Sequence, residues 1–274
     1  MKCGWNSLLC LLPGWMRSQV DKEGKDNLQE LRLRLGEPPE LVLGENSLWL
    51  ERSVTAEDIS FCINLASRYS PWAVETMTQG YLTALGGHRI GICGCAVYKN
   101  GSIGVTRDIT SLCIRVARDY PGIGENINAT GSVLILGAPG WGKTTLLRDL
   151  ARVRARKKPV AVVDERGELF PEGFLRGKRM DVLVGARKPD GIDRVLRTMG
   201  PDTIAVDEIT AGEDCNALYH AAGCGVKLLA TAHAGSLEEF YERPLYKPLA
   251  DSKLFDYFLI LQRDKSFKVE RRRL

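Results

Sequence analysis

The chain has 274 residues, enough for one large domain or two domains of medium size. The chain has 38 lysine and arginine residues and 34 aspartate and glutamate residues, a formal net charge of +4. This weak positive charge argues against a nucleic-acid-binding protein. None of the eight cysteines forms a Cys-x-x-Cys pair, so we expect neither a zinc site nor disulfides. Free thiols indicate that the protein works in a reducing cytoplasm. Cys62, Cys113 and Cys224 lie in apolar runs and are expected to be small buried residues.

The N-terminal segment contains an apolar run over residues 8–12, flanked by Trp5 and Trp15. The run is too short to span a bilayer and has no signal-peptide cleavage site after it. It predicts a core or interfacial helix. The two tryptophans leave peripheral contact with a membrane surface open.

Short elements follow up to about residue 120. Residues 31–35 alternate leucine with arginine, which predicts a half-buried strand, and residues 41–50 predict a strand pair. Residues 55–58 match a capping box at the start of a helix. The Asn-Gly pair within residues 99–102 is typical of a hairpin turn, and residues 109–117 are interpreted as an amphipathic helix.

His88 lies in a Gly-Gly-His-Arg turn. A structural role in that turn is favoured over contact with a ligand. Beyond the Pro121-Gly122 pair the pattern changes to alternating strands and helices, as in an α/β domain. We therefore expect an N-terminal α/β domain over residues 1–125 and a second domain over residues 126–274. The strands expected in the second domain are residues 133–136, 159–164, 203–207, 227–233 and 255–261. The basic residues 271–273 are expected to form a solvated tail.

A glycine-rich loop joins the first of these strands to a helix. Gly137 and the Gly142-Lys143-Thr144 triplet have the spacing of a phosphate-binding P-loop. The N–H groups of such a loop point inward as an anion nest, and the helix adds its positive dipole end. We expect Lys143 to contact the β- and γ-phosphates and Thr144 to offer its hydroxyl to Mg²⁺. The residues expected to bind the nucleotide are Gly137, Ala138, Pro139, Gly140, Trp141, Gly142, Lys143, Thr144 and Thr145.

Two later strands end in carboxylates, at the sheet edge where α/β domains bind ligands. Asp207 follows the P-loop by about sixty residues, as expected for a Walker B acid that binds Mg²⁺. Glu208 is a candidate to orient or deprotonate the attacking water. Asp164, Glu165 and Glu168 form a second acidic cluster. For that cluster, a share in water activation and a purely structural surface network are equal alternatives.

Two further residue types complete the expected site. His233 ends a strand that should lie near the γ-phosphate, which favours a ligand-sensing role over a structural one. Phosphoryl transfer also needs positive charge at the transition state, commonly from an arginine of a neighbour. Arg187, Arg194 and Arg197 are the candidates, acting in their own subunit or across an interface.

These segments resemble the motifs of the secretion-ATPase superfamily, in the same order. They are Walker A at 137–144, the Asp box at 164–168, the arginine at 197, Walker B at 207–208 and the His box at 231–234. The resemblance implies a RecA-like P-loop NTPase core with a smaller α/β N-terminal domain, and ATP and Mg²⁺ as cofactors. It implies Glu208, Glu165, His233 and Arg197 as catalytic residues and Thr144 and Asp207 as metal ligands.

A closer resemblance, over nearly the whole chain, is to the stage III sporulation protein AA family of endospore-forming bacteria. Residues 28–36, 80–91, 109–118 and 146–150 carry it. It implies an ATPase of the mother-cell cytoplasm that forms a hexameric homo-oligomer. The oligomer is expected to dock on membrane-embedded channel proteins that connect mother cell and forespore, with peripheral membrane contact. A nucleotide-binding switch or scaffold with little turnover is the alternative, and a nucleic-acid motor or a kinase is a third class.

The sequence departs from the family pattern at two places. Trp141 occupies a P-loop position where the family usually has a small residue. The Asp207-Glu208 pair contains both Walker B acids, whereas many secretion ATPases have Gly-Glu. The choice between Glu165 and Glu208 as the group that activates water is therefore open.

Overall fold

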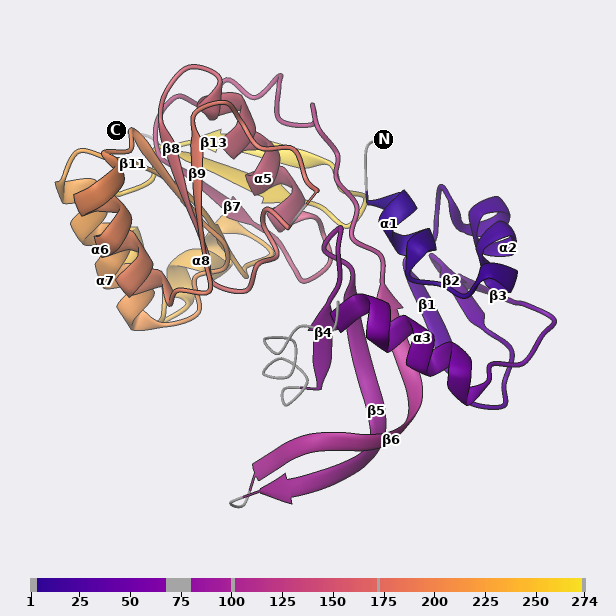
Figure 1. Ribbon diagram of the computed structural model, residues 1–274. Coiled ribbons are helices and arrows are strands. Elements are labelled where there is room, and N and C mark those ends of the chain that lie inside the picture. The colour runs from indigo at the N-terminus through magenta and orange to yellow at the C-terminus, as the bar shows by residue number, and fades with distance from the viewer. Residues whose placement is uncertain (1–3, 68–79, 100–101, 172, 273–274) are drawn as a thin grey trace. The chain divides into compact units, whose positions relative to one another are not determined.

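The computed structural model describes residues 4–67, 80–99, 102–171 and 173–272. The chain divides into two compact units, one made of Met1–Asp119 with Pro171–Phe174 and the other of Tyr120–Phe170 with Leu175–Leu274 (Figure 1). No helix in the described part of the chain is long and apolar enough to cross a membrane.

The first unit is built on a six-stranded antiparallel sheet with the order β3-β2-β1-β6-β5-β4. The apolar faces of its helices pack on this sheet and form one core. The elements are α1 (Trp5–Cys10), α2 (Gly14–Gly24), β1 (Glu30–Arg34), β2 (Glu40–Leu43), β3 (Asn46–Trp49), α3 (Ala56–Ser67), β4 (Tyr81–Thr83), β5 (Arg89–Lys99) and β6 (Ser102–Arg115).

Strand β1 confirms the alternating pattern. Leu31 and Leu33 are fully buried, and the arginines between and after them point away from the core. Arg32 pairs with Glu30 at 2.7 Å and Arg34 pairs with Glu40 at 2.8 Å. The predicted strand pair is β2 and β3. The turn residues between β5 and β6 lie outside the described residues, but Lys99 and Ser102 are paired as a hairpin requires.

The predicted helix over residues 109–117 is wrong, because most of this segment is the second half of β6. Leu112 and Ile114 are both buried two residues apart, which is a strand period. Ile114 pairs with Leu31 of β1 on one side and with Ile90 of β5 on the other. Backbone partners on both sides therefore outweigh the helical spacing of the apolar residues.

The capping box at the start of α3 is confirmed. The backbone N–H of Thr55 donates to Asp58 Oδ2 at 3.0 Å, and the N–H of Asp58 donates to Thr55 Oγ1 at 3.3 Å. The two N-terminal tryptophans belong to the core of the same unit. The Trp5 indole donates to Asp21 at 2.6 Å and the Trp15 indole to Asp58 at 3.0 Å. Both rings are thus used to fix the N-terminal helices.

The cysteines follow the prediction in part. Cys62 is fully buried in the first unit, and burial raises the pKa of its thiol to about 12. Cys113 is half-buried in β6. Cys224 is exposed at the end of a helix, so its predicted burial is wrong.

His88 has the structural role that the sequence favours. Its ring is fully buried, and Nε2 lies 2.8 Å from the carbonyl oxygen of Gly4. Nδ1 accepts a hydrogen bond from the backbone N–H of Ala117 at 3.2 Å. The neutral ring therefore joins the start of the chain to the segment after β6. Burial lowers the pKa of His88, with a smaller contribution from the positive charge of Arg118.

The lowered pKa of His88 predicts that acid destabilises this protein. The unfolded histidine takes up a proton near pH 6.5 while the folded one resists, so the free energy of unfolding should fall as the pH drops below about 6.5. Urea unfolding at pH 7.5 and pH 5.5 measures this loss. His88→Asn keeps an acceptor near Nδ1 and should show a smaller loss. An equal loss in both proteins would contradict the assignment.

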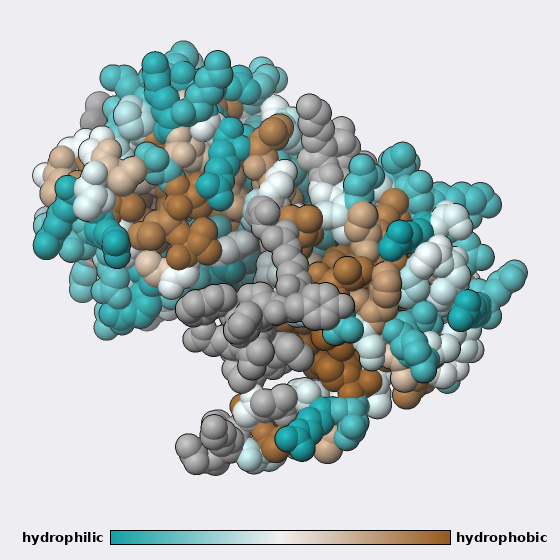
Figure 2. All heavy atoms as spheres, in the orientation of Figure 1, coloured by the Kyte–Doolittle hydropathy of each residue, from teal (hydrophilic) through white to brown (hydrophobic). Residues whose placement is uncertain are grey.

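The second unit is built on a seven-stranded sheet with the order β13-β12-β7-β11-β10-β8-β9. All neighbours are parallel except β12 and β13. Figure 2 shows hydrophilic side chains along the periphery of this unit. The elements are β7 (Val133–Leu136), α5 (Lys143–Ala155), β8 (Val160–Asp164), β9 (Met180–Val184), α6 (Lys188–Met199), β10 (Thr203–Val206), α7 (Gly212–Gly223), β11 (Lys227–Ala232), α8 (Leu237–Glu242), α9 (Lys247–Asp251), β12 (Tyr257–Leu261) and β13 (Phe267–Arg271).

Helices cover both faces of this sheet. Along β7, Val133 and Ile135 face the core that includes α5, while Leu134 and Leu136 face the core that includes α6 and α7. The sheet is therefore buried on both sides, which explains why its central strands are continuous apolar runs. The second domain has the predicted RecA-like α/β form.

Two strands were not expected from the sequence. Strand β9 has mostly exposed or half-buried residues and pairs with β8 at the sheet edge. Strand β13 includes Arg271, so the backbone there is paired and the predicted tail is wrong for this residue. Its side chains after Phe267 are exposed, and backbone pairing with β12 alone defines it.

Candidate active site

The P-loop lies between β7 and α5. Gly140 has φ of +78° and Gly142 has φ of +101°, values in the left-handed region that favours glycine. The buried Lys143 ammonium donates to the carbonyl oxygens of Gly137 at 2.8 Å and Ala138 at 3.0 Å, so it lies within the curve of the loop. Burial lowers the pKa of Lys143, and the negative charges of Asp207 and Glu208 oppose this shift.

The Asp207 carboxylate joins the first turn of α5 and strand β11 to the end of β10. Thr144 Oγ1, in the first turn of α5, donates to Asp207 Oδ2 at 2.9 Å. Thr231 Oγ1, in β11, donates to Asp207 Oδ1 at 2.9 Å. Because β11 lies between β7 and β10 in the sheet, its threonine is placed beside the acid that follows β10. The predicted Walker A hydroxyl and Walker B acid are thus brought together.

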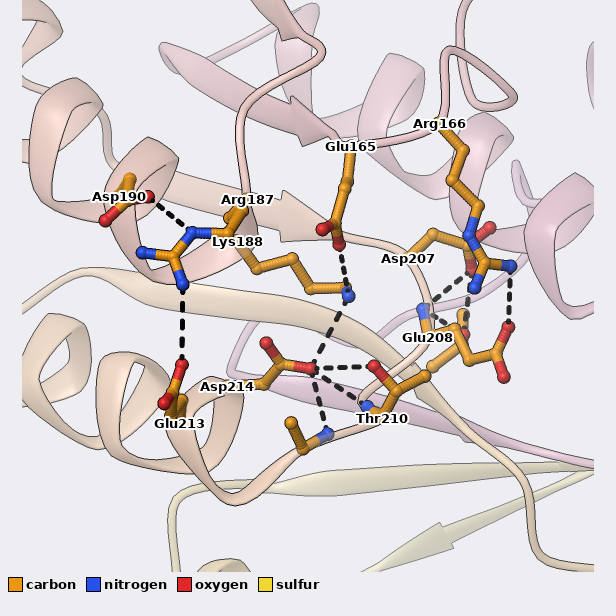
Figure 3. A network of polar contacts seen from close by, with 12 residues as sticks. Glu165, Arg166, Arg187, Lys188, Asp190, Asp207, Glu208, Thr210, Glu213 and Asp214 are labelled. Carbon is orange, nitrogen blue, oxygen red and sulfur yellow. Dashed lines mark hydrogen bonds and ion pairs between the residues drawn. The ribbon is translucent and has the colours of Figure 1, made fainter. Parts of the chain in front are cut away.

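Glu208 has φ of +33°, an uncommon conformation for a residue with a side chain. Its backbone N–H lies 2.9 Å from Thr231 Oγ1 and 3.0 Å from Asp207 Oδ1, which holds it there. Glu208 Oε1 lies 3.2 Å from His233 Nε2. Glu208 Oε2 lies 3.7 Å from Arg166 Nη1 (Figure 3). Strained backbone at the end of a sheet is a frequent feature of active sites.

His233 is oriented by its neighbours. Its backbone N–H donates to the Tyr246 hydroxyl at 3.1 Å, a contact that the sequence did not indicate. Burial lowers the pKa of His233, and the nearby charge of Lys143 lowers it further, while Glu208 and Asp207 raise it. A lowered pKa favours the neutral imidazole at neutral pH. The histidine lies beside Glu208, and its ligand-sensing role stays a prediction.

The two acids at the end of β8, Asp164 and Glu165, have different surroundings. Asp164 is buried and accepts backbone N–H groups of Glu168, Leu169 and Phe170, at 2.9, 2.8 and 3.1 Å. Burial nevertheless raises the pKa of Asp164. This carboxylate therefore shapes the loop after β8. Glu165 instead forms an ion pair with Lys188, with Oε2 2.7 Å from Nζ.

A small cavity of about 70 Å³ lies where these groups meet. It is lined by Thr144, Asp164, Glu165, Arg166, Glu168, Lys188, Asp207 and Glu208. Lys188 is the functional candidate that sequence reasoning missed. Its partner is 23 positions away in the sequence, and no local pattern connects the two.

The candidate arginines do not line this cavity. Arg197 pairs with Asp193 at 3.0 Å on α6, and 76% of its side chain is exposed. Arg187 pairs with Asp190 at 2.9 Å and lies 3.8 Å from Glu213 (Figure 3).

A second cavity, of about 340 Å³, lies beside the P-loop. Apolar and aromatic side chains dominate its wall, and the Trp141 ring packs against the core on the α5 face of the sheet. The wall consists of Tyr120, Ile123, Gly140, Trp141, Gly142, Thr145, Leu146, Leu261, Lys265 and Phe267. The unusual P-loop tryptophan thus belongs to an apolar pocket next to the phosphate loop.

The bridging hydroxyl of Thr231 yields a stability prediction. Thr231→Val removes the donor to Asp207 and the acceptor for the Glu208 N–H at a fully buried position of β11. We expect the free energy of unfolding to fall by about 1–3 kcal/mol, measured by urea denaturation. Thr231→Ser retains the hydroxyl and should lose less. Equal stability of the valine variant and the parent would refute the bridging role.

A known protein family matches nearly the whole chain. The family model described as "Sporulation stage III, protein AA" matches residues 7–270. Stage III sporulation protein AA of Bacillus subtilis is 36% identical over 283 residues, which cover 95% of this chain and 92% of that protein.

Two solved structures have a similar fold. The ATPase DotB of Legionella pneumophila matches with a TM-score of 0.61 and 18% identity, over 95% of this chain and 80% of that one. The pilus retraction motor PilT with bound ADP matches with a TM-score of 0.62 and 15% identity, over 88% of this chain and 76% of that one. The fold is thus that of secretion and pilus ATPases, and the chain itself belongs to the stage III sporulation protein AA family.

Proposed function

We propose that this protein hydrolyses ATP in a Mg²⁺-dependent reaction, with residues 126–274 as the ATPase domain. The observation that carries the proposal is the hydrogen bond of 2.9 Å between Thr144 Oγ1 and Asp207 Oδ2. It joins the hydroxyl that follows the P-loop lysine to the acid that follows β10. P-loop ATPases bind Mg²⁺ through such a hydroxyl and such an acid.

The oxygen atoms present fit Mg²⁺. Thr144 and Asp207 would hold it, and oxygen ligands are those that this hard cation prefers. Among the described residues, no group of three or more His, Cys, Asp or Glu side chains is arranged to hold a metal. Few protein ligands are normal for Mg²⁺ at a nucleotide, because phosphates and water complete its shell. When bound, it neutralises charge that develops on the phosphates.

Glu208 is the proposed general base. Water oxygen attacks the γ-phosphorus, the bond from phosphorus to the ADP oxygen breaks, and a proton of the water passes to the Glu208 carboxylate. ADP and inorganic phosphate leave. His233 lies 3.2 Å from that carboxylate and orients it, while Lys143 binds the phosphates. Glu165, the other candidate base expected from the sequence, is paired with Lys188 at 2.7 Å and takes no part in the proton transfer of this scheme.

The apolar cavity beside the P-loop is the proposed site of the nucleotide base. Trp141, Tyr120 and Phe267 contribute aromatic rings to its wall. Such rings bind a flat heteroaromatic base by stacking.

We further propose that the protein forms a homo-hexamer in the mother-cell cytoplasm. It would energise a membrane-embedded channel between mother cell and forespore. Arg197 is largely exposed, so a ring would allow it to reach the nucleotide of a neighbouring subunit. A nucleotide-dependent switch or scaffold with little turnover is the alternative. Steady-state phosphate release, with and without the membrane partners, separates the two.

Lys143→Ala should abolish ATP binding and phosphate release, because the phosphates lose their lysine contact. Equilibrium binding of a fluorescent ATP analogue and a phosphate-release assay measure both losses. Lys227→Ala is the control. Lys227 is exposed and pairs with Asp202 at 3.8 Å, at the N-terminal ends of β10 and β11, which lie away from the P-loop. Turnover like that of the parent in the Lys143 variant would defeat the proposal.

Trp141→Ala should weaken ATP binding by about 10-fold, because the stacking surface for the base is lost. Trp141→Phe keeps a ring and should retain most of the affinity. Inorganic tripolyphosphate has no base, so its own dissociation constant, measured by competition with the nucleotide, should be the same in both variants. Unchanged ATP affinity in the alanine variant would exclude the base from this cavity.

A further inference from the structure

Lys188 holds a buried positive charge between two carboxylates. Its Nζ lies 2.7 Å from Glu165 Oε2 and 3.4 Å from Asp214 Oδ2, and 8% of its side chain is exposed (Figure 3). A lysine is rarely buried to this extent unless its charge is paired. Lys188 also lines the small cavity that contains Thr144 and Asp207.

The two partners of Lys188 differ in how firmly they are held. Asp214 Oδ2 accepts the Thr210 N–H at 2.9 Å, the Thr210 hydroxyl at 3.2 Å and the Ala211 N–H at 3.2 Å. Asp214 is therefore fixed to the loop that follows Glu208. Glu165 has 36% of its side chain exposed, and Lys188 holds its carboxylate in place.

The wall of the cavity carries an excess of negative charge. Five carboxylates line it, and the cations in its wall are Arg166 and Lys188. Arg166 is 61% exposed, so solvent weakens its effect, whereas Lys188 is screened much less. An unpaired Glu165 would repel both the other acids and an incoming phosphate.

We propose that Lys188 is a positioning residue whose ammonium neutralises Glu165. This pairing removes one negative charge from the cavity and leaves Glu208, not Glu165, as the carboxylate that receives the proton of the attacking water. The inference rests on the proposed ATPase function. It assigns Glu165 and Glu208 different tasks from their different partners.

The test compares Lys188→Met, Glu165→Gln and the double variant in the full chain. Lys188→Met should weaken binding of a non-hydrolysable ATP analogue about 5-fold more than binding of ADP, because the exposed Glu165 charge acts most strongly on the terminal phosphate. Its kcat should fall at least about 10-fold. Adding Glu165→Gln removes the unpaired charge, so it should restore both the ATP preference and most of the kcat.

The single variants separate the two carboxylates. Glu165→Gln alone should keep kcat within about 3-fold of the parent, whereas Glu208→Gln should lower it by about 100-fold or more. Lys227→Met is the matched control for replacing a paired lysine and should leave kcat and both affinities unchanged. Urea denaturation of every variant checks that loss of kcat is not loss of folding.

Three results would overturn the inference. The first is a Glu165→Gln variant as inactive as Glu208→Gln. The second is a double variant whose kcat and ATP preference are no higher than those of Lys188→Met. The third is an Asp214→Asn variant with the same losses as Lys188→Met. Either of these two results would mean that Lys188 only connects α6 to α7. Absence of turnover in the parent protein would defeat the proposed function instead. In that case the difference between ATP-analogue and ADP binding still decides whether Lys188 neutralises Glu165.

Discussion

The second unit depends on the hydrogen bonds of one carboxylate. Asp207 accepts the hydroxyls of Thr144 and Thr231, each at 2.9 Å, and the backbone N–H of Glu208 at 3.0 Å. These bonds fix the P-loop helix, the central strand β11 and the end of β10 relative to one another. The uncommon backbone conformation of Glu208 persists because the same cluster holds its N–H. The chemistry proposed for the site therefore depends on these hydrogen bonds at the carboxyl edge of the sheet.

Hydrogen bonds and charge pairing give similar acids different surroundings. Asp164 bonds backbone N–H groups and shapes a loop, Glu165 is paired with Lys188, and Glu208 lies beside His233. The partners come from different elements: the loop after β8 for Asp164, α6 for Glu165 and the end of β11 for Glu208. The family and the fold are established by the sequence match and by the structural likeness to secretion and pilus ATPases. The different partners of these acids support the proposed hydrolysis, and the apolar pocket with Trp141 supports the proposed binding of a nucleotide base.

The first unit uses its unusual residues for folding. Trp5, Trp15 and His88 are each joined by hydrogen bonds to groups far away in the sequence, and all three lie in or beside the core. The antiparallel sheet has β6 as its longest strand, with partners on both sides. A segment with helical spacing of apolar residues becomes a strand there because neighbouring strands supply its backbone hydrogen bonds.

The sequence by itself determined the P-loop, the buried strands and the acids that end them, because these are local patterns of residue type and spacing. It also indicated the capping box of α3 and the structural role of His88. Only the tertiary structure decided that β11 lies between β7 and β10 and so places Thr231 on Asp207. The pairing of Lys188 with Glu165, the exposed strand β9 and the strand at residues 109–115 also depend on partners distant in sequence. Spacing along the chain carries no signal of such partners, since the order of strands in the sheet differs from their order in the chain.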